Sequence, residues 1–246
     1  MSTTALPHWD LSDLYPSLGS REYAAAREAF GAGVVRLEAL FDEHDVRGGD
    51  ALAVDASTVK AFEESINGAN ETLNELRRVN AYISSFVTTN ARDDAAQAEL
   101  SGLQKDSARL GKLRTRLDAF VARFDTGALV DASTVASDHA FPLERAVLRA
   151  THQMSEPEEA LSSDLGLTGG SAWYRMYSDI SARVTAPVDL PDIGVKELPM
   201  SQVRALAKDA DRATRKAAFD AELAGWEQWS VPIAAALNSI KGEAAT

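Results

Sequence analysis

Apolar residues recur every three or four positions along three long stretches of the chain, which is the spacing of one face of an α-helix. The first stretch follows Ser20, a suitable N-cap, and its pattern ends at Gly48-Gly49. The second follows Ser57-Thr58 and breaks at Thr88-Thr89-Asn90, where Asn90, with Asp93 three residues later, can cap the third. The apolar positions are Tyr23, Phe30, Val34, Leu37 and Phe41; Val59, Phe62, Ile66, Leu73, Leu76, Val79, Ile83 and Phe86; and Leu100, Leu103, Leu110, Leu113, Leu117, Phe120 and Phe124. This pattern predicts long antiparallel helices.

Before Ser20, prolines and turn-forming residues alternate with apolar ones. We expect Trp9, Leu11, Leu14 and Tyr15 to hold this stretch against the helices as an ordered arm. After the third stretch, residues 125–140 are small and polar, which is typical of a loop or a weak helix. Pro142 then fits the first turn of a further helix.

The stretch from Ser155 to Arg183 contains two helix starts and a double-glycine joint. Ser155 and Glu158 have the spacing of a capping box, and the helix they begin is expected to end near Leu165-Gly166. The joint Thr168-Gly169-Gly170-Ser171 follows, and a second helix begins behind it. Its apolar face carries Ala172, Trp173, Met176, Tyr177 and Ile180, and we expect that face to be buried.

Beyond this stretch the period changes from helical spacing to alternation. Val184, Ala186, Val188 and Leu190 alternate with other residues, and a turn at residues 191–194 is followed by residues 195–198, which can pair back. These features predict a small β-hairpin near 184–198, whose Pro187 restricts its strand to an edge.

Helical spacing returns after Pro199. It predicts a short helix from Ser201 and a long helix from Asp211, kinked at Pro232. No glycine or proline stop follows this pattern near Thr246, so we expect the helix to continue past that residue. The predicted fold is mostly α, with long antiparallel amphipathic helices and one small β-hairpin. We divide it into an ordered N-terminal arm (1–19), a long-helix region (20–154) and a helical region with the hairpin (155–246).

Composition limits the possible partners. The chain has 246 residues, 45% of them hydrophobic, which is enough to bury a sizeable core. Its net charge of −12 repels phosphates, so we expect neither nucleic acid nor an anionic membrane surface as a partner. The chain has no cysteine, and its start has no signal-peptide pattern. No apolar run approaches the roughly 20 residues that a membrane span needs, and we predict a cytoplasmic protein.

Motifs for catalysis are missing from the sequence. None of the histidines, His8, His44, His139 and His152, begins an H-E-x-x-H zinc motif. There is no phosphate-binding loop of the Walker type and no G-x-S-x-G elbow, and cysteine chemistry is excluded. Adjacent acids such as Glu63-Glu64 diverge on a helix and cannot share a proton. We therefore assign no catalytic or metal-binding residue to this chain.

Three segments nevertheless resemble one family. They are WDLSDLY near the start, LGLTGGSAWYRMYSDISARV in the middle, and DADRATRKAAFDAELAGWEQWSVPIAAALNSIKGE at the end. They resemble the N-terminal portion of M3-family oligoendopeptidases, the oligoendopeptidase F group of zinc metallopeptidases. The resemblance implies a parent enzyme that hydrolyses short peptides in the cytosol, with zinc activating water inside a channel. It also implies that the catalytic domain is absent from this chain, which alone would be inactive and bind no zinc.

Two questions stay open at this stage. Trp173, Tyr174 and Tyr177 are typical of core packing, although they are also the residues we would test for contact with a peptide substrate. The alternative to a peptidase part is a stand-alone helical interaction module without catalytic activity, whose long amphipathic faces bind a partner helix. A helical metal carrier is set aside because the chain has too few histidines.

Overall fold

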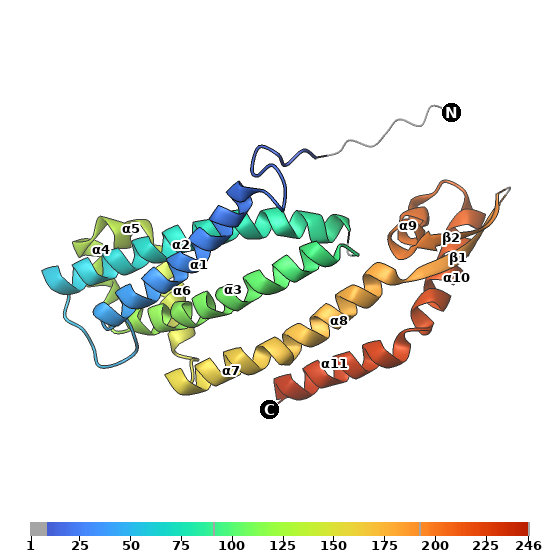
Figure 1. Ribbon diagram of the computed structural model, residues 1–246. Coiled ribbons are helices and arrows are strands. Elements are labelled where there is room, and N and C mark those ends of the chain that lie inside the picture. The colour runs from blue at the N-terminus through green and yellow to red at the C-terminus, as the bar shows by residue number, and fades with distance from the viewer. Residues whose placement is uncertain (1–8, 91, 192, 246) are drawn as a thin grey trace. The chain divides into compact units, whose positions relative to one another are not determined.

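The computed structural model describes residues 9–90, 92–191 and 193–245 (Figure 1). The chain divides into two units, one up to Ser163 and one from Asp164 onward, and each is described by itself. The helices and strands in chain order are α1 (Arg21–Glu43), α2 (Ala56–Thr89), α3 (Asp94–Val121), α4 (Thr126–Ala132), α5 (Thr134–Asp138), α6 (Ala140–Ala150), α7 (Glu156–Thr168), α8 (Gly170–Arg183), β1 (Thr185–Leu190), β2 (Gly194–Pro199), α9 (Met200–Ala205), η1 (Leu206–Lys208), α10 (Arg212–Glu227) and α11 (Ser230–Ala245). The predicted fold class, mostly α with one small hairpin, is confirmed.

The first unit is built on the antiparallel helices α1, α2 and α3, which pack against one another, and α6 packs on α3 (Figure 1). Side chains cap each long helix at its start. The Ser20 hydroxyl accepts from the Tyr23 amide at 3.2 Å, and the Asp93 carboxylate accepts from the Ala96 amide at 3.0 Å. Asp55 caps α2, so this helix begins slightly before the predicted Ser57-Thr58. The three long helices predicted from periodicity are therefore present.

The core of this unit is aromatic at both ends. Tyr15, Tyr23 and Tyr82 form one cluster, in which the Tyr82 hydroxyl donates to the Tyr15 carbonyl at 2.9 Å. This contact explains how the N-terminal arm is held, because Tyr15 is buried. Trp9, by contrast, is 87% exposed, so it is not buried against the helices as expected. Leu14 is also exposed, while Leu11 packs against the core, and residues 1–8 of the predicted arm lie outside the described residues.

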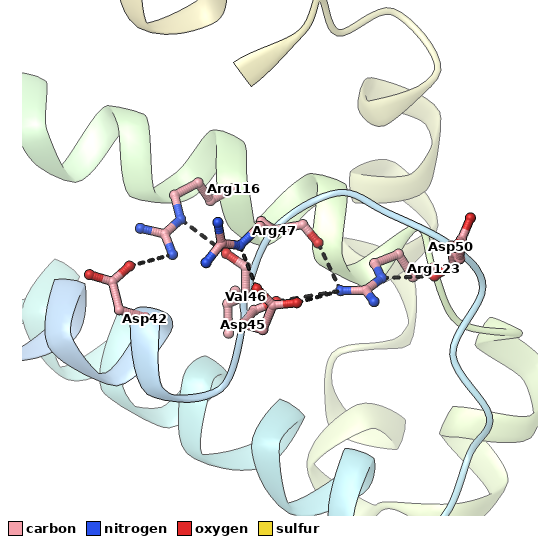
Figure 2. Close-up of polar contacts among 7 residues, drawn as sticks. All are labelled: Asp42, Asp45, Val46, Arg47, Asp50, Arg116 and Arg123. Carbon is pink, nitrogen blue, oxygen red and sulfur yellow. Dashed lines mark hydrogen bonds and ion pairs between the residues drawn. The ribbon is translucent and has the colours of Figure 1, made fainter. Parts of the chain in front are cut away.

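The loop between α1 and α2 is held by arginines of α3 and of the residues just after it (Figure 2). Arg116 donates to the Val46 carbonyl at 3.0 Å. Arg123 donates to the carbonyls of Asp50 and Arg47, at 2.9 Å and 3.2 Å. These charge-assisted bonds satisfy backbone oxygens that have no secondary structure to bond with. The loop is consequently a fixed part of the bundle.

One boundary in this region differs from the prediction. α1 ends at Glu43, with His44 as its C-cap, and not at Gly48-Gly49. The reason is local: Asp45 adopts a left-handed conformation, with φ of 51°, and the Val46 amide bonds back to the Phe41 carbonyl at 2.8 Å. An aspartate serves here in the position that glycine usually fills, and apolar spacing did not reveal it.

The segment predicted as a loop or weak helix forms the two short helices α4 and α5, and Pro142 lies in the first turn of α6 as expected. α6 is joined to α3 by an ion pair. The Arg149 guanidinium donates two hydrogen bonds, of 2.6 Å and 2.7 Å, to the carboxylate of Asp118. Asp118 is buried, and these bonds raise the pKa of Arg149.

The second unit has a small core around the predicted hairpin. β1 and β2 pair antiparallel, with Ala186 opposite Leu198 and Leu190 opposite Gly194, whose φ of 82° suits glycine. Pro187 lies in a two-stranded sheet, in which each strand has a free edge. The buried core consists of Val184, Ala186, Val188, Met200, Val203, Ala218 and Ala221, so β1 is covered by α9 and α10.

The long helix predicted from Asp211 is wrong in one respect. Asp211 caps α10 as expected, since its carboxylate accepts from the Thr214 amide at 2.8 Å. The helix does not merely kink at Pro232, because α10 ends at Glu227 and α11 begins at Ser230. Proline has no amide hydrogen and clashes with the preceding turn, so it is tolerated best near a helix start. Pro232 lies in the first turn of α11.

Candidate functional site

Ser155 and Glu158, the predicted capping pair, interact at the start of α7. The Glu158 carboxylate accepts from the Ser155 amide at 2.9 Å and from the Ser155 hydroxyl at 2.6 Å. These two bonds lower the pKa of Glu158. The serine hydroxyl therefore donates to the carboxylate, whereas the predicted capping box has it accept from the Glu158 amide.

The end of α7 differs from the prediction as well. The helix continues through Leu165-Gly166 to Thr168, and among the described glycines only Gly194 has a positive φ. The break comes at Gly169, whose φ and ψ of −89° and −118° interrupt the helix before α8. The double-glycine joint thus lies where it was expected, and Gly166 is an ordinary helical residue.

The three candidate aromatic residues lie on α8, but this helix has no buried residue. Trp173 is half-buried, Tyr177 is 42% exposed and Tyr174 is 69% exposed. The expectation of a buried face is therefore wrong. Within its own unit α8 packs on α11, which covers only part of its surface. The spacing of apolar residues identifies an apolar face, and it does not say whether another element covers that face.

Exposed apolar side chains continue on neighbouring elements of the second unit. Val231 is 78% exposed, and Leu237 and Ile240 also reach the surface of α11. Two buried polar atoms, Ser181 Oγ and Trp226 Nε1, have no hydrogen-bond partner there. This unit therefore has a small core, exposed aromatic and apolar side chains, and two buried polar atoms without a hydrogen-bond partner.

The histidines that the structure describes do not form a metal site. His44 Nε2 lies 2.7 Å from Glu64 Oε2. His139 bonds through Nδ1 to the Val135 carbonyl and through Nε2 to the Asn70 amide, so both ring nitrogens are occupied. His152 is exposed, and His8 lies outside the described residues.

Across the part of the chain that the structure describes, no group of three or more His, Asp or Glu side chains is arranged to hold a metal ion. The described residues therefore do not fit a zinc ion.

Sequence reasoning missed the ion pair of the buried acid Asp118. Asp118 lies among Leu110, Leu113 and Val121, which belong to the apolar face of α3. An acidic residue at such a position is the available signal, because a charge on a core face needs a partner. The partner, Arg149, lies on another helix and cannot be identified from spacing.

The structure shows a helical protein with one hairpin and an exposed aromatic helix. Comparison with known families shows which proteins it resembles. The family model for the N-terminal domain of M3 peptidases, described as Oligopeptidase F, matches residues 128–185. This match extends from α4 to the first residue of β1 and includes all of α8. It confirms the resemblance to the N-terminal portion of M3 oligoendopeptidases. Comparison with curated proteins and with solved structures gave no match.

Among the described residues, no helix combines the length and the apolar character that crossing a bilayer requires.

Proposed function

We propose that this chain is the N-terminal helical part of a zinc-dependent oligoendopeptidase, an enzyme that hydrolyses short peptides inside a channel in the cytosol. The observation that carries the proposal is the match of residues 128–185 to the Oligopeptidase F model. The residues that would bind zinc and activate water are not among these 246, because the sequence contains no H-E-x-x-H motif.

In this proposal the chain contributes binding surface and no chemistry. Tyr174 and Tyr177 offer exposed rings that can pack on apolar side chains of a peptide, and hydroxyls that can bond to its backbone. Trp173, which is half-buried, contributes to the same helix surface. Short peptides are the proposed partners, and the net charge of −12 argues against nucleic acid and anionic membranes.

The first test is the coding DNA after codon 246, read in the same frame. An H-E-x-x-H segment with a later glutamate supports the proposal, and a stop codon directly after Thr246 contradicts it. If the segment is present, the protein encoded by the whole frame should cleave quenched fluorescent peptides and lose this activity with a zinc chelator.

The second test concerns the aromatic residues in that protein. Tyr174→Ala combined with Tyr177→Ala should raise KM several-fold and leave kcat nearly unchanged, because the lost contacts serve ground state and transition state alike. Phe219→Ala is the matched control, since Phe219 is a similarly exposed ring in the same unit but outside the matched segment. If the original protein, the double tyrosine variant and Phe219→Ala have equal KM values, α8 is not part of the peptide-binding surface.

A stand-alone interaction module is the alternative, and the exposed Val231 and Leu237 on α11 favour it. In that case a partner helix covers the apolar surface and no peptide is cut. The two proposals predict different results. An interaction module binds its partner helix although no peptidase domain is encoded in the same reading frame.

A further inference from the structure

The first unit contains a cavity of about 430 Å³ between α2, α3 and α6, and no sequence motif predicts it. Its floor is apolar and deep, because Leu37 and Phe41 of α1 and Leu113 of α3 are buried there. Its walls include Leu73 and Leu110. A cavity of this size is within the range of small-molecule binding sites, which span about 300–1,000 Å³.

The charged groups around this cavity are mostly positive. Arg77 comes from α2 and Arg114 from α3, and both are exposed. Neither has an ion-pair or hydrogen-bond partner among the described residues. The one acid in the lining, Asp118, is already neutralised by two hydrogen bonds from Arg149. The lining therefore has unused positive charge beside apolar walls, in a protein whose net charge is −12.

We propose that this cavity binds an amphiphilic carboxylate, a molecule with an unbranched apolar tail and one anionic head group. The tail packs on Leu73, Leu76 and Leu117, which line the cavity and are only partly buried, so it removes their apolar surface from water. The carboxylate pairs with Arg77 or Arg114, whose guanidinium groups match its geometry. This inference goes beyond the proposed peptidase function and does not depend on it.

Other ligand classes fit less well. A cation would meet Arg77 and Arg114 with no free acid in the lining. A neutral apolar molecule would leave both guanidinium groups unused. A highly charged ligand would leave the apolar floor unfilled. The combination of an apolar floor and an unpaired guanidinium mouth selects a ligand with both features.

The test uses decanoate as the probe and decanol as its uncharged counterpart, each titrated into the purified protein by calorimetry. Decanoate should bind saturably at one site and more tightly than decanol. Arg77→Gln combined with Arg114→Gln should weaken decanoate binding about tenfold, which corresponds to about 1.4 kcal/mol, and leave decanol binding unchanged.

Arg78→Gln is the matched control, because Arg78 is an exposed arginine of α2 outside the cavity lining and should leave decanoate affinity unchanged. A second variant, Ala69→Leu, adds volume to the lining and should weaken both probes. The proposal is overturned if decanoate does not bind saturably or if decanol binds as tightly as decanoate. It is also overturned if Arg78→Gln weakens decanoate binding as much as the double variant does. Because these readouts measure ligand affinity, they are independent of any peptidase result.

Discussion

The two units of this chain use the same kind of helix in different ways. In the first, the apolar faces of α1, α2 and α3 cover one another, and rings such as Phe30, Phe41 and Phe62 have no exposed surface. In the second, the core is mostly valine and alanine, and α8 has no buried residue. An apolar stripe on a helix thus becomes part of a core in one unit and stays at the surface in the other. The covering elements differ, because α1, α2 and α3 pack on one another, whereas α8 packs on α11.

The largest contrast should come from removing a ring in each unit. Phe62→Ala should destabilise the first unit by about 3–5 kcal/mol, because it leaves a cavity beside Phe124. Tyr174→Ala should change stability by less than about 0.5 kcal/mol, because this ring is mostly exposed. Urea unfolding of both variants checks the comparison, which fails if the two losses are similar.

The next effect concerns the ion pair between the buried Asp118 and the partly exposed Arg149. Arg149→Met leaves the Asp118 carboxylate buried without its partner and should cost about 2 kcal/mol. The double variant Asp118→Leu with Arg149→Met should recover most of this loss, since apolar residues of similar size often replace such pairs without penalty. A double variant no more stable than Arg149→Met would mean that the arginine stem, and not the charge, carries the effect. Thermal unfolding of the three proteins measures this.

A smaller effect tests how closely the second unit is packed. A Cβ on Gly225 would lie 3.2 Å from the Ala186 Cβ and 3.0 Å from the Met200 Cε. Gly225→Ala should therefore destabilise this unit by about 1 kcal/mol, although alanine favours helices. Gly166→Ala is the control, because nothing lies within 4 Å of its added Cβ, and it should stabilise α7 by up to about 1 kcal/mol. Opposite shifts in melting temperature are expected, and shifts of the same sign would contradict this packing.

The smallest effect is on acid stability. The Thr58 amide and the Ser57 side chain hold the pKa of Asp55 below its ordinary value. A group whose pKa is lower in the folded state stabilises the fold above its unfolded pKa, about 3.9, and loses this contribution as pH falls through the folded pKa. Asp55→Asn keeps an acceptor for the cap without this titration. Its stability should therefore fall less steeply than that of the original protein below about pH 4, and parallel curves would contradict the assignment.

Features of the fold that have a local cause could be predicted from the sequence. Ser20 and Asp211 were placed at helix starts, where each side chain bonds to the amide three residues later, and the hairpin followed from alternation. The cap of the third helix was misplaced, because Asp93 caps α3 and the predicted Asn90 ends α2. Features that depend on residues far away in the sequence could not be predicted. The burial of α8 depends on which elements cover it, and the Asp118–Arg149 pair joins two separate helices. The cavity lined by Arg77 and Arg114 depends in the same way on the spacing of three helices.

The arginine contacts of the α1–α2 loop have a consequence for hydrogen exchange. The Leu52 amide donates to the Arg123 carbonyl at 2.8 Å. The Arg123 side chain in turn donates to carbonyls of the loop (Figure 2). The Leu52 amide is therefore tied to a segment far away in sequence. Although the loop has no regular structure, this amide should exchange at the rate of the end of α3, as one cooperative unit with it.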